Sequence, residues 1–427
     1  MSTSKGTRHV SKDPSAKQTP EPLYGTQTRL SLQNFHPRGR RVGDIPAFIR
    51  NYALVKKAAA AANRALGVLD SSRAQAIIDA CDEMAAGSHA GQFPTALVLG
   101  GGGTTTNMNI NEVIAARATQ LAGIPVHPND HVNASQSTND TFPTAMALTI
   151  MELAEGPLSA LDELAETLEG KAAEYAETRY LGRTCLQDAV SVRAGQTLRG
   201  QARAVRRGAD QLGEAVGNLS ALPLGATVLG TSIGSPDGFA ATCFDELTRL
   251  IDQNVTLSED FFDALAHLDP YAAVADAASR SAITVARIAA DLRLRSSGPH
   301  GGLAEVTIPR LQAGSSIMPA KVNPVVPEFA MQLSYRVRGA AYTISCAVAA
   351  GELELNVMEP VIIDSLLDIF EDLQQAARTM ATLCVSGLEW SGARREENLA
   401  HAVDRWVELA GVSGYDEASR HVMTMRD

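Results

Sequence analysis

The pattern of apolar and polar positions along this 427-residue chain is predominantly helical. Between residues 271 and 294, small or apolar side chains recur every three to four positions, at Val274, Ala278, Ser281, Val285, Ile288 and Leu292. This period predicts one amphipathic helix of about six turns. Similar patterns predict helices near residues 46–87, 111–122, 139–180 (with an interruption near 156–157), 195–222, 329–355 and 361–388.

Few segments favour strands. The four glycines at 100–103 break the pattern, and the Asp237-Gly238 pair follows a proline without alternating apolar flanks, so it predicts a loop turn. Long helices that are apolar on several sides usually pack in bundles, often across subunits. We therefore expect a mainly α protein with a disordered tail (1–22), an N-terminal helical domain (23–138), a central helical-bundle domain (139–390) and a short C-terminal helical domain (391–427).

Composition restricts the class of protein. With 45% hydrophobic residues the chain can bury a large core, and its net charge of −11 argues against nucleic acid or an anionic membrane as the main partner. A local lysine or helix N-terminus can still bind a small acidic substrate. The five cysteines are scattered and form no CxxC pair, which predicts neither a disulfide framework nor structural zinc. Without a membrane-length apolar run or a secretory h-region, a cytoplasmic location is expected.

The segment with the most chemistry is residues 314–324, GSSIMPAKVNP. Its prolines exclude a plain helix, and Gly314 permits a mobile hinge. Lys321 and Asn323 are suited to bind a carboxylate, while a serine hydroxyl can move a proton. Taken alone, the segment also fits a phosphate-binding loop or an inert turn.

Three further segments combine polar donors with tight turns. Residues 102–109 (GGTTTNMN) offer backbone N–H groups and hydroxyls to an anion, but also fit a flexible turn. Residues 127–140 (HPNDHVNASQSTND) precede a helix and include a capping residue. Their His127, Asp130 and His131 match no common metal-ligand spacing. Residues 182–189 (GRTCLQDA) fit a turn between helices in which Cys185 is a small buried apolar residue.

These four segments resemble the signatures of the aspartase/fumarase superfamily, and the similarity runs from about residue 24 to residue 388. The resemblance implies a homotetramer with a central bundle of long helices, active sites each shared among three subunits, a small dicarboxylate substrate, and no cofactor or metal. It also implies roles for individual residues. Ser315 is the general base that takes the C3 proton, Lys321 and Asn323 bind the α-carboxylate, and Thr104, Ser137, Thr138 and Ser316 hold the β-carboxylate. Asn139 and Thr184 face the amino group, Cys185 is part of the substrate-binding pocket, and Glu328 supports Cys185.

Within the superfamily the signals are mixed. Residues 319–328 (PAKVNPVVPE) and 355–362 (LNVMEPVI) resemble aspartate ammonia-lyases, whereas residues 139–146 (NDTFPTAM) are more similar to fumarases. Cys185 stands where fumarases and many aspartases carry histidine, and His300 where an arginine is usual. Arg29 lies one position before a site where relatives carry arginine, and the C-terminus is shorter than in typical aspartases.

We therefore expect a lyase that deaminates L-aspartate reversibly to fumarate and ammonia. The alternatives are a fumarate hydratase, a lyase that eliminates another group from a substituted succinate, and a catalytically silent structural or regulatory homologue. The presence of Ser315, Lys321 and Asn323 argues against the last alternative.

Overall fold

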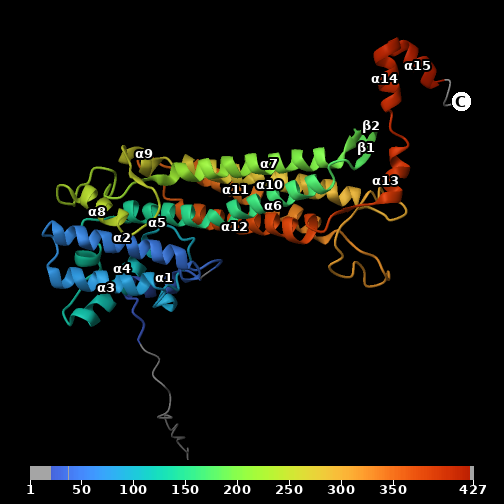
Figure 1. Cartoon of the computed structure of the whole chain (residues 1–427). Coiled ribbons are helices and arrows are strands. Elements are labelled where there is room, and N and C mark those ends of the chain that lie inside the picture. Colours follow the sequence, from blue (N-terminus) through green and yellow to red (C-terminus); the bar gives the residue numbers. More distant parts are fainter. Residues whose placement is uncertain (1–20, 37, 424–427) are drawn as a thin grey trace, which may run out of the picture.

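The computed structural model describes residues 21–36 and 38–423, and these residues are mainly helical, as predicted. The expected disordered tail lies outside the described residues except for its last two positions. Near the N-terminus, four helices pack together below the bundle (Figure 1): α1 (Thr26–Asn34), α2 (Pro46–Ala65), α3 (Ser71–Ala85) and α4 (Thr104–Ala122). Asp70 begins α3 by accepting hydrogen bonds from the backbone N–H groups of Ser72 (3.1 Å) and Arg73 (3.0 Å).

Long helices run side by side through the centre of the molecule (Figure 1). They are α5 (Thr138–Leu153), α6 (Glu155–Glu174), α7 (Ala194–Gly217), α10 (Asp269–Arg295), α11 (Val325–Val348) and α12 (Glu359–Thr379). The long amphipathic helix predicted over residues 271–294 is confirmed as α10, and all six positions of its predicted stripe are buried. Its 27 residues span about 40 Å at 1.5 Å per residue, so it connects the two ends of the bundle.

Some predicted helix limits are wrong. Helix α4 begins at Thr104 rather than near residue 111, because Gly103 adopts a left-handed N-cap conformation (φ 83°) directly after the glycine run. Helix α11 ends at Val348 rather than near residue 355. The segment predicted as helix over 361–388 consists of α12 followed by a wide π-helical turn over Met380–Val385.

The largest error is an antiparallel hairpin where we expected the end of a helix and an interhelical turn. Strand β1 (Arg179–Thr184) pairs with β2 (Gln187–Arg193), and Thr184 opposite Gln187 leaves Cys185 and Leu186 as a two-residue loop. Both loop residues have positive φ, 53° and 63°. Asn and Gly usually mark such turns, so this sequence gave no signal for one.

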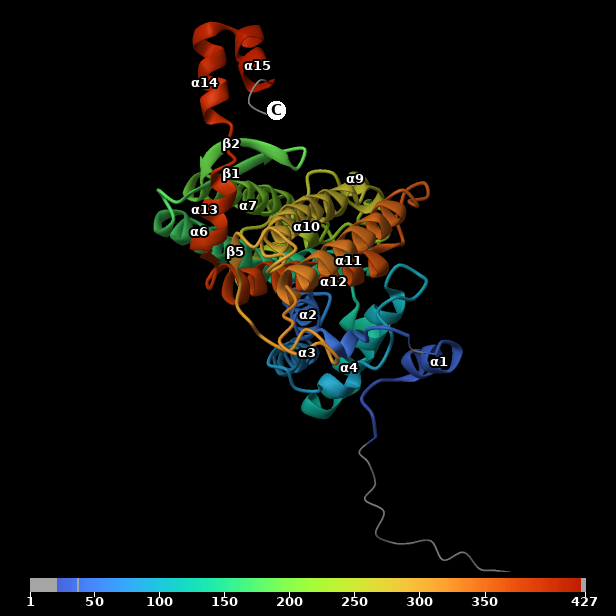
Figure 2. The same ribbon diagram turned by 90° about the vertical axis from the view of Figure 1, so that its right-hand side faces the viewer.

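Short elements complete the chain. The remaining helices and strands are β3 (Ala221–Leu222), α8 (Phe239–Thr248), β4 (Thr256–Leu257), α9 (Phe261–Ala266), β5 (Val306–Thr307), β6 (Glu389–Trp390), α13 (Gly392–Leu399), α14 (Asp404–Ser413) and α15 (Tyr415–Met423). Figure 2 shows α14 and α15 standing out from the bundle on the side opposite α2–α4. Asp404 attaches them to β2 by accepting from the N–H (3.0 Å) and the hydroxyl (2.8 Å) of Ser191. No helix among the described residues is long and apolar enough to cross a membrane.

Candidate active site

The N-termini of α4 and α5 form one cluster of predicted site residues. Gly103 packs directly on α5, since a Cβ at this glycine would lie 2.2 Å from the Phe142 ring. This close approach places Thr104 beside the first turn of α5. Thr104 is exposed, and its hydroxyl donates to the Gly101 carbonyl at 2.7 Å.

Ser137 is the N-cap of α5. Its Oγ accepts from the Asn139 N–H at 3.2 Å, and its own N–H donates to Asp140 Oδ1 at 2.9 Å. Together these bonds form a capping box, which fixes the first turn of the helix. Because a helix N-terminus carries partial positive charge, this turn is a suitable place for a substrate carboxylate.

Thr138 and Asn139 point to different surroundings. Thr138 is buried, and its Oγ1 accepts from the Asn107 amide of α4 at 3.0 Å. The half-buried Asn139 uses its Nδ2 to donate to the Val228 carbonyl at 2.8 Å. Val228 belongs to the loop between β3 and α8, which our sequence analysis did not connect with the site.

A buried polar network lies behind this cluster. Asn133 Oδ1 accepts from Lys56 Nζ (2.9 Å), Asn111 Nδ2 (3.1 Å) and Asn107 Nδ2 (3.2 Å). Lys56 is fully buried, and the loss of solvent lowers the pKa of its ammonium to about 7, although the Asp140 carboxylate opposes this shift. Sequence analysis missed Lys56 because it lies in an Ala-rich helix, where a lysine normally reaches solvent.

Asp140 is the second buried ionisable group here. Burial raises the pKa of its carboxyl to about 7, against the opposing effect of hydrogen bonds from the N–H groups of Ser137 and Thr227. Both oxygens accept from backbone N–H groups, with Thr227 N at 3.0 Å from Oδ2. These N–H donors favour the carboxylate form and so oppose the effect of burial.

The serine loop is folded on itself. Gly314 N–H donates to the Lys321 carbonyl and Asn323 Nδ2 donates to the Gly314 carbonyl, both at 2.9 Å, which closes a ring around residues 315–320. Ser315 Oγ accepts from the N–H groups of Met318 (3.0 Å) and Ile317 (3.2 Å). Two such donors stabilise negative charge on the oxygen, the change that a serine needs to act as a base.

The other polar groups of this loop are available to a ligand. Lys321 and Ser316 are exposed, and Asn323 is half-buried. Glu328, at the start of α11, forms an ion pair with Arg293 at 3.2 Å. Within the chain, Glu328 therefore has a cationic partner on α10.

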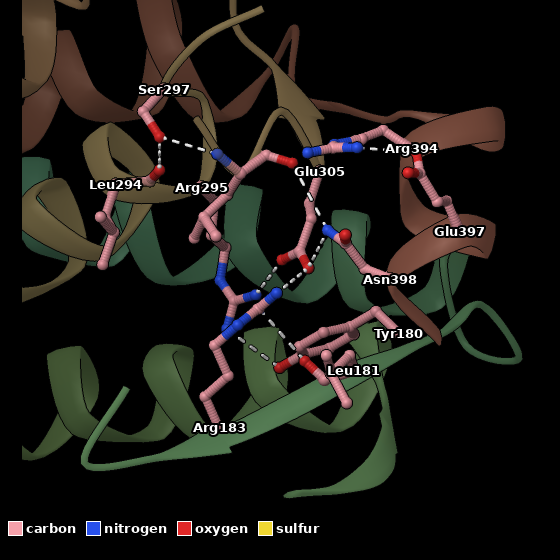
Figure 3. A network of polar contacts seen from close by, with 11 residues as sticks. Tyr180, Leu181, Arg183, Leu294, Arg295, Ser297, Glu305, Arg394, Glu397 and Asn398 are labelled. Atoms are coloured by element: carbon pink, nitrogen blue, oxygen red, sulfur yellow. Dashed lines mark hydrogen bonds and ion pairs between the residues drawn. The ribbon is translucent and has the colours of Figure 1, made fainter. Parts of the chain in front are cut away.

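The hairpin carries Thr184 and Cys185 at an exposed tip. The interpretation of Cys185 as a buried apolar residue is wrong, since its thiol is exposed at the turn. Figure 3 shows how the base of the hairpin is held. The fully buried Glu305 pairs with Arg183 of β1 (2.8 Å) and with Arg295 of α10 (3.0 Å), and accepts from Asn398 of α13 (3.1 Å).

Aromatic side chains complete this anchor. The Arg295 guanidinium lies 4.5 Å from the Tyr180 ring centroid and 5.6 Å from that of Trp390. Cation–π contacts of this kind add to the ion pairs with Glu305. The hairpin tip is consequently carried on a fixed base.

One chain does not bring the predicted residues into a single pocket. The N-termini of α4 and α5 lie at one end of the bundle, whereas the hairpin and the loop between α10 and α11 lie at the other (Figure 1). The chain therefore presents separate sets of donors on separate surfaces. Among the described residues, no group of three or more His, Cys, Asp or Glu side chains is arranged to hold a metal ion. His127 instead accepts from the N–H groups of Asn129 and Asp130.

Comparison with known proteins gives a consistent result. A family model described as lyase matches residues 15–339. The chain is 38% identical over 390 residues to an aspartate ammonia-lyase of Escherichia coli (strain K12), covering 90% of this chain and 80% of the relative. It is 39% identical over 404 residues to a class II fumarate hydratase of Nitrosomonas europaea, covering 93% and 87% respectively. The crystal structure of a class II fumarase from Schistosoma mansoni superposes with a TM-score of 0.90 at 34% identity, covering 95% of this chain and 89% of that one.

Proposed function

The chain belongs to the aspartase/fumarase superfamily of lyases, and on that premise we propose that it eliminates ammonia reversibly from L-aspartate to give fumarate. Relatives named for ammonia elimination and for hydration are equally similar to it, so overall identity does not choose the leaving group. The choice rests on the groups that would face the substituent on C2 of the substrate.

The orientation of the Asn139 amide carries this proposal. Its Nδ2 donates to the Val228 carbonyl at 2.8 Å, which leaves Oδ1 directed elsewhere as an acceptor. An ammonium group has three N–H donors and no lone pair, so it needs an acceptor. A hydroxyl substituent can either donate or accept a hydrogen bond. It therefore depends less on an amide whose oxygen is the group offered to the substrate.

The proton to be removed is a very weak acid, because it lies on the carbon next to a carboxylate. Its removal gives a dianionic aci-carboxylate, and donors must converge where that charge develops. We assign this task to the hydroxyls of Thr104, Ser137, Thr138 and Ser316, and the Thr104 hydroxyl must turn away from the Gly101 carbonyl to donate to the substrate. The base is Ser315, whose Oγ receives two backbone N–H donors. Lys321 and Asn323 bind the α-carboxylate as a charged and a neutral donor.

Three subunits of a homotetramer supply each active site in this proposal. In one chain, the N-termini of α4 and α5 lie at one end of the bundle, whereas the β1–β2 hairpin and the loop between α10 and α11 lie at the other (Figure 1). A substrate as small as aspartate contacts all of these segments only if neighbouring chains bring them together. Closure of the loop that begins at Gly314 would then exclude water from the substrate.

Cys185 supports ammonia rather than water as the leaving group. Hydroxide is a poor leaving group and benefits from an acid, whereas an ammonium substituent leaves as neutral ammonia without one. A thiol is a weak proton donor in comparison with a histidine side chain, which titrates near neutrality. We expect Cys185→His to raise dehydration of malate relative to deamination of aspartate. Leu186→His is the matched control, since it places the same ring on the other residue of the turn. An equal effect of both variants would show that Cys185 does not determine the leaving group.

The deciding experiment supplies purified protein with fumarate plus ammonium, and separately with fumarate alone. We expect aspartate in the first reaction and little malate in the second. Malate formed faster than aspartate would identify a fumarate hydratase instead. If fumarate is consumed in neither reaction, the enzyme eliminates a different group from a substituted succinate, and the proposal is wrong.

A further inference from the structure

The loop between β3 and α8 touches the first turn of α5 at two consecutive residues. Thr227 N–H donates to Asp140 Oδ2 at 3.0 Å, and the next carbonyl, that of Val228, accepts from Asn139 Nδ2 at 2.8 Å. The other oxygen of Asp140 accepts from Ser137 N–H at 2.9 Å. One buried carboxylate therefore links the helix cap to a loop 87 residues away in the chain.

This loop is strained, although bonds within it help to fix its shape: the Gly230 and Ser232 N–H groups donate to the Ala226 carbonyl (3.0 and 3.3 Å). Thr227 is a β-branched residue in the left-handed region (φ 59°), where such residues cost about 1–2 kcal/mol. Its hydroxyl is buried and lacks a hydrogen-bond partner. Gly225, at φ 90°, lies so close to α8 that a Cβ there would be 2.4 Å from the Ala240 Cβ. Two bonds join this loop to the first turn of α5: Thr227 N–H donates to Asp140, and Asn139 Nδ2 donates to the Val228 carbonyl.

We propose that Asp140 is a positioning residue that clamps residues 225–232 against α5 and thereby fixes the Asn139 amide with its oxygen free for the substrate amino group. Because Asp140 is completely buried, we place it behind the substrate rather than against it. It acts through the loop, because the Val228 carbonyl stays opposite Asn139 Nδ2 only while the Thr227 N–H is held. The clamp thus sets the preference for an amine over a hydroxyl substituent, and in this respect it rests on the proposed function.

Asp140→Asn tests the clamp with little change in shape. An amide presents one acceptor oxygen, so its NH₂ group must face one of the two N–H donors. We expect amide hydrogen exchange in residues 225–232 to accelerate at least about tenfold, which corresponds to about 1.4 kcal/mol. The ratio of kcat/KM for aspartate deamination to that for malate dehydration should fall by a similar factor. The matched control is Asp44→Asn, which removes the acidic member of another capping box, where Arg41 N–H donates to Asp44 at 2.8 Å.

Gly225→Ala disturbs the loop where it packs against Ala240 of α8, and it keeps the Asp140 carboxylate. If it changes the substrate ratio in the same direction as Asp140→Asn, the loop carries the effect. A changed ratio in Asp140→Asn alone would mean that the charge acts directly, and the positioning role would be wrong. Unchanged exchange in residues 225–232 of Asp140→Asn would also refute the clamp. Hydrogen exchange needs no substrate, so it tests the clamp even if the wild-type protein forms no aspartate. A wild-type protein that forms no aspartate would overturn only the proposed reaction and the link between the clamp and substrate preference.

Discussion

Replacing Glu305 by glutamine should loosen the hairpin that carries Thr184. The wild-type carboxylate is completely buried and accepts charge-assisted bonds from Arg183 (2.8 Å) and Arg295 (3.0 Å). A charge-assisted bond contributes about 1.5–3 kcal/mol and a neutral one about 0.5–1.5 kcal/mol. Replacing both charge-assisted bonds by neutral ones should therefore lower the free energy of unfolding by about 2–3 kcal/mol. This is slightly less than the roughly 3–5 kcal/mol lost when one partner of a buried ion pair is deleted.

Urea unfolding followed by circular dichroism measures this cost, and substrate kinetics measure its effect on the hairpin. We expect a higher KM, because a looser hairpin holds Thr184 less firmly against the substrate. Glu169→Gln is the control, because Glu169 forms an exposed two-bond pair with Arg206 (3.0 and 2.9 Å), and the loss of an exposed pair should change the stability little. If Glu305→Gln is no less stable than Glu169→Gln, the buried network does not hold the hairpin in the way we describe.

Three other outcomes follow from the site and the surface. Ser315→Ala should lower turnover by at least about 10²–10⁴-fold without changing the oligomeric state seen by size exclusion, and near-normal activity would exclude Ser315 as the base. Ser315→Ala and Thr184→Ala proteins, dissociated together and reassembled, should regain activity in hybrid sites that avoid both changes. Reassembled hybrids without activity would contradict shared sites. Hydrogen bonds from Arg117 hold the pKa of Glu83 at about 2, below its usual 4.5, so the ionised carboxylate stabilises the fold above about pH 4.5 and this contribution is lost as the pH falls toward 2. Glu83→Gln should flatten the acid side of the stability curve over that range, and an unchanged curve would show that the pair contributes nothing.

Much of the fold could be predicted from the sequence because a helix depends on neighbours three and four residues apart. The buried stripe of α10 follows from its own spacing, as does the position of Ser137 as a cap before α5. The motif residues could also be named, because their segments resemble the signatures of the aspartase/fumarase superfamily.

Tertiary structure alone decided how those donors are held. The hairpin tip at Cys185 has no Asn or Gly to announce it, and its base depends on Glu305, more than a hundred positions further along. Asn139 is oriented by the Val228 carbonyl, and Asp140 by the Thr227 N–H. A buried carboxylate or amide must satisfy its hydrogen bonds with whichever groups the fold brings to it. Its partners are therefore set by packing between distant segments, which local periodicity does not encode.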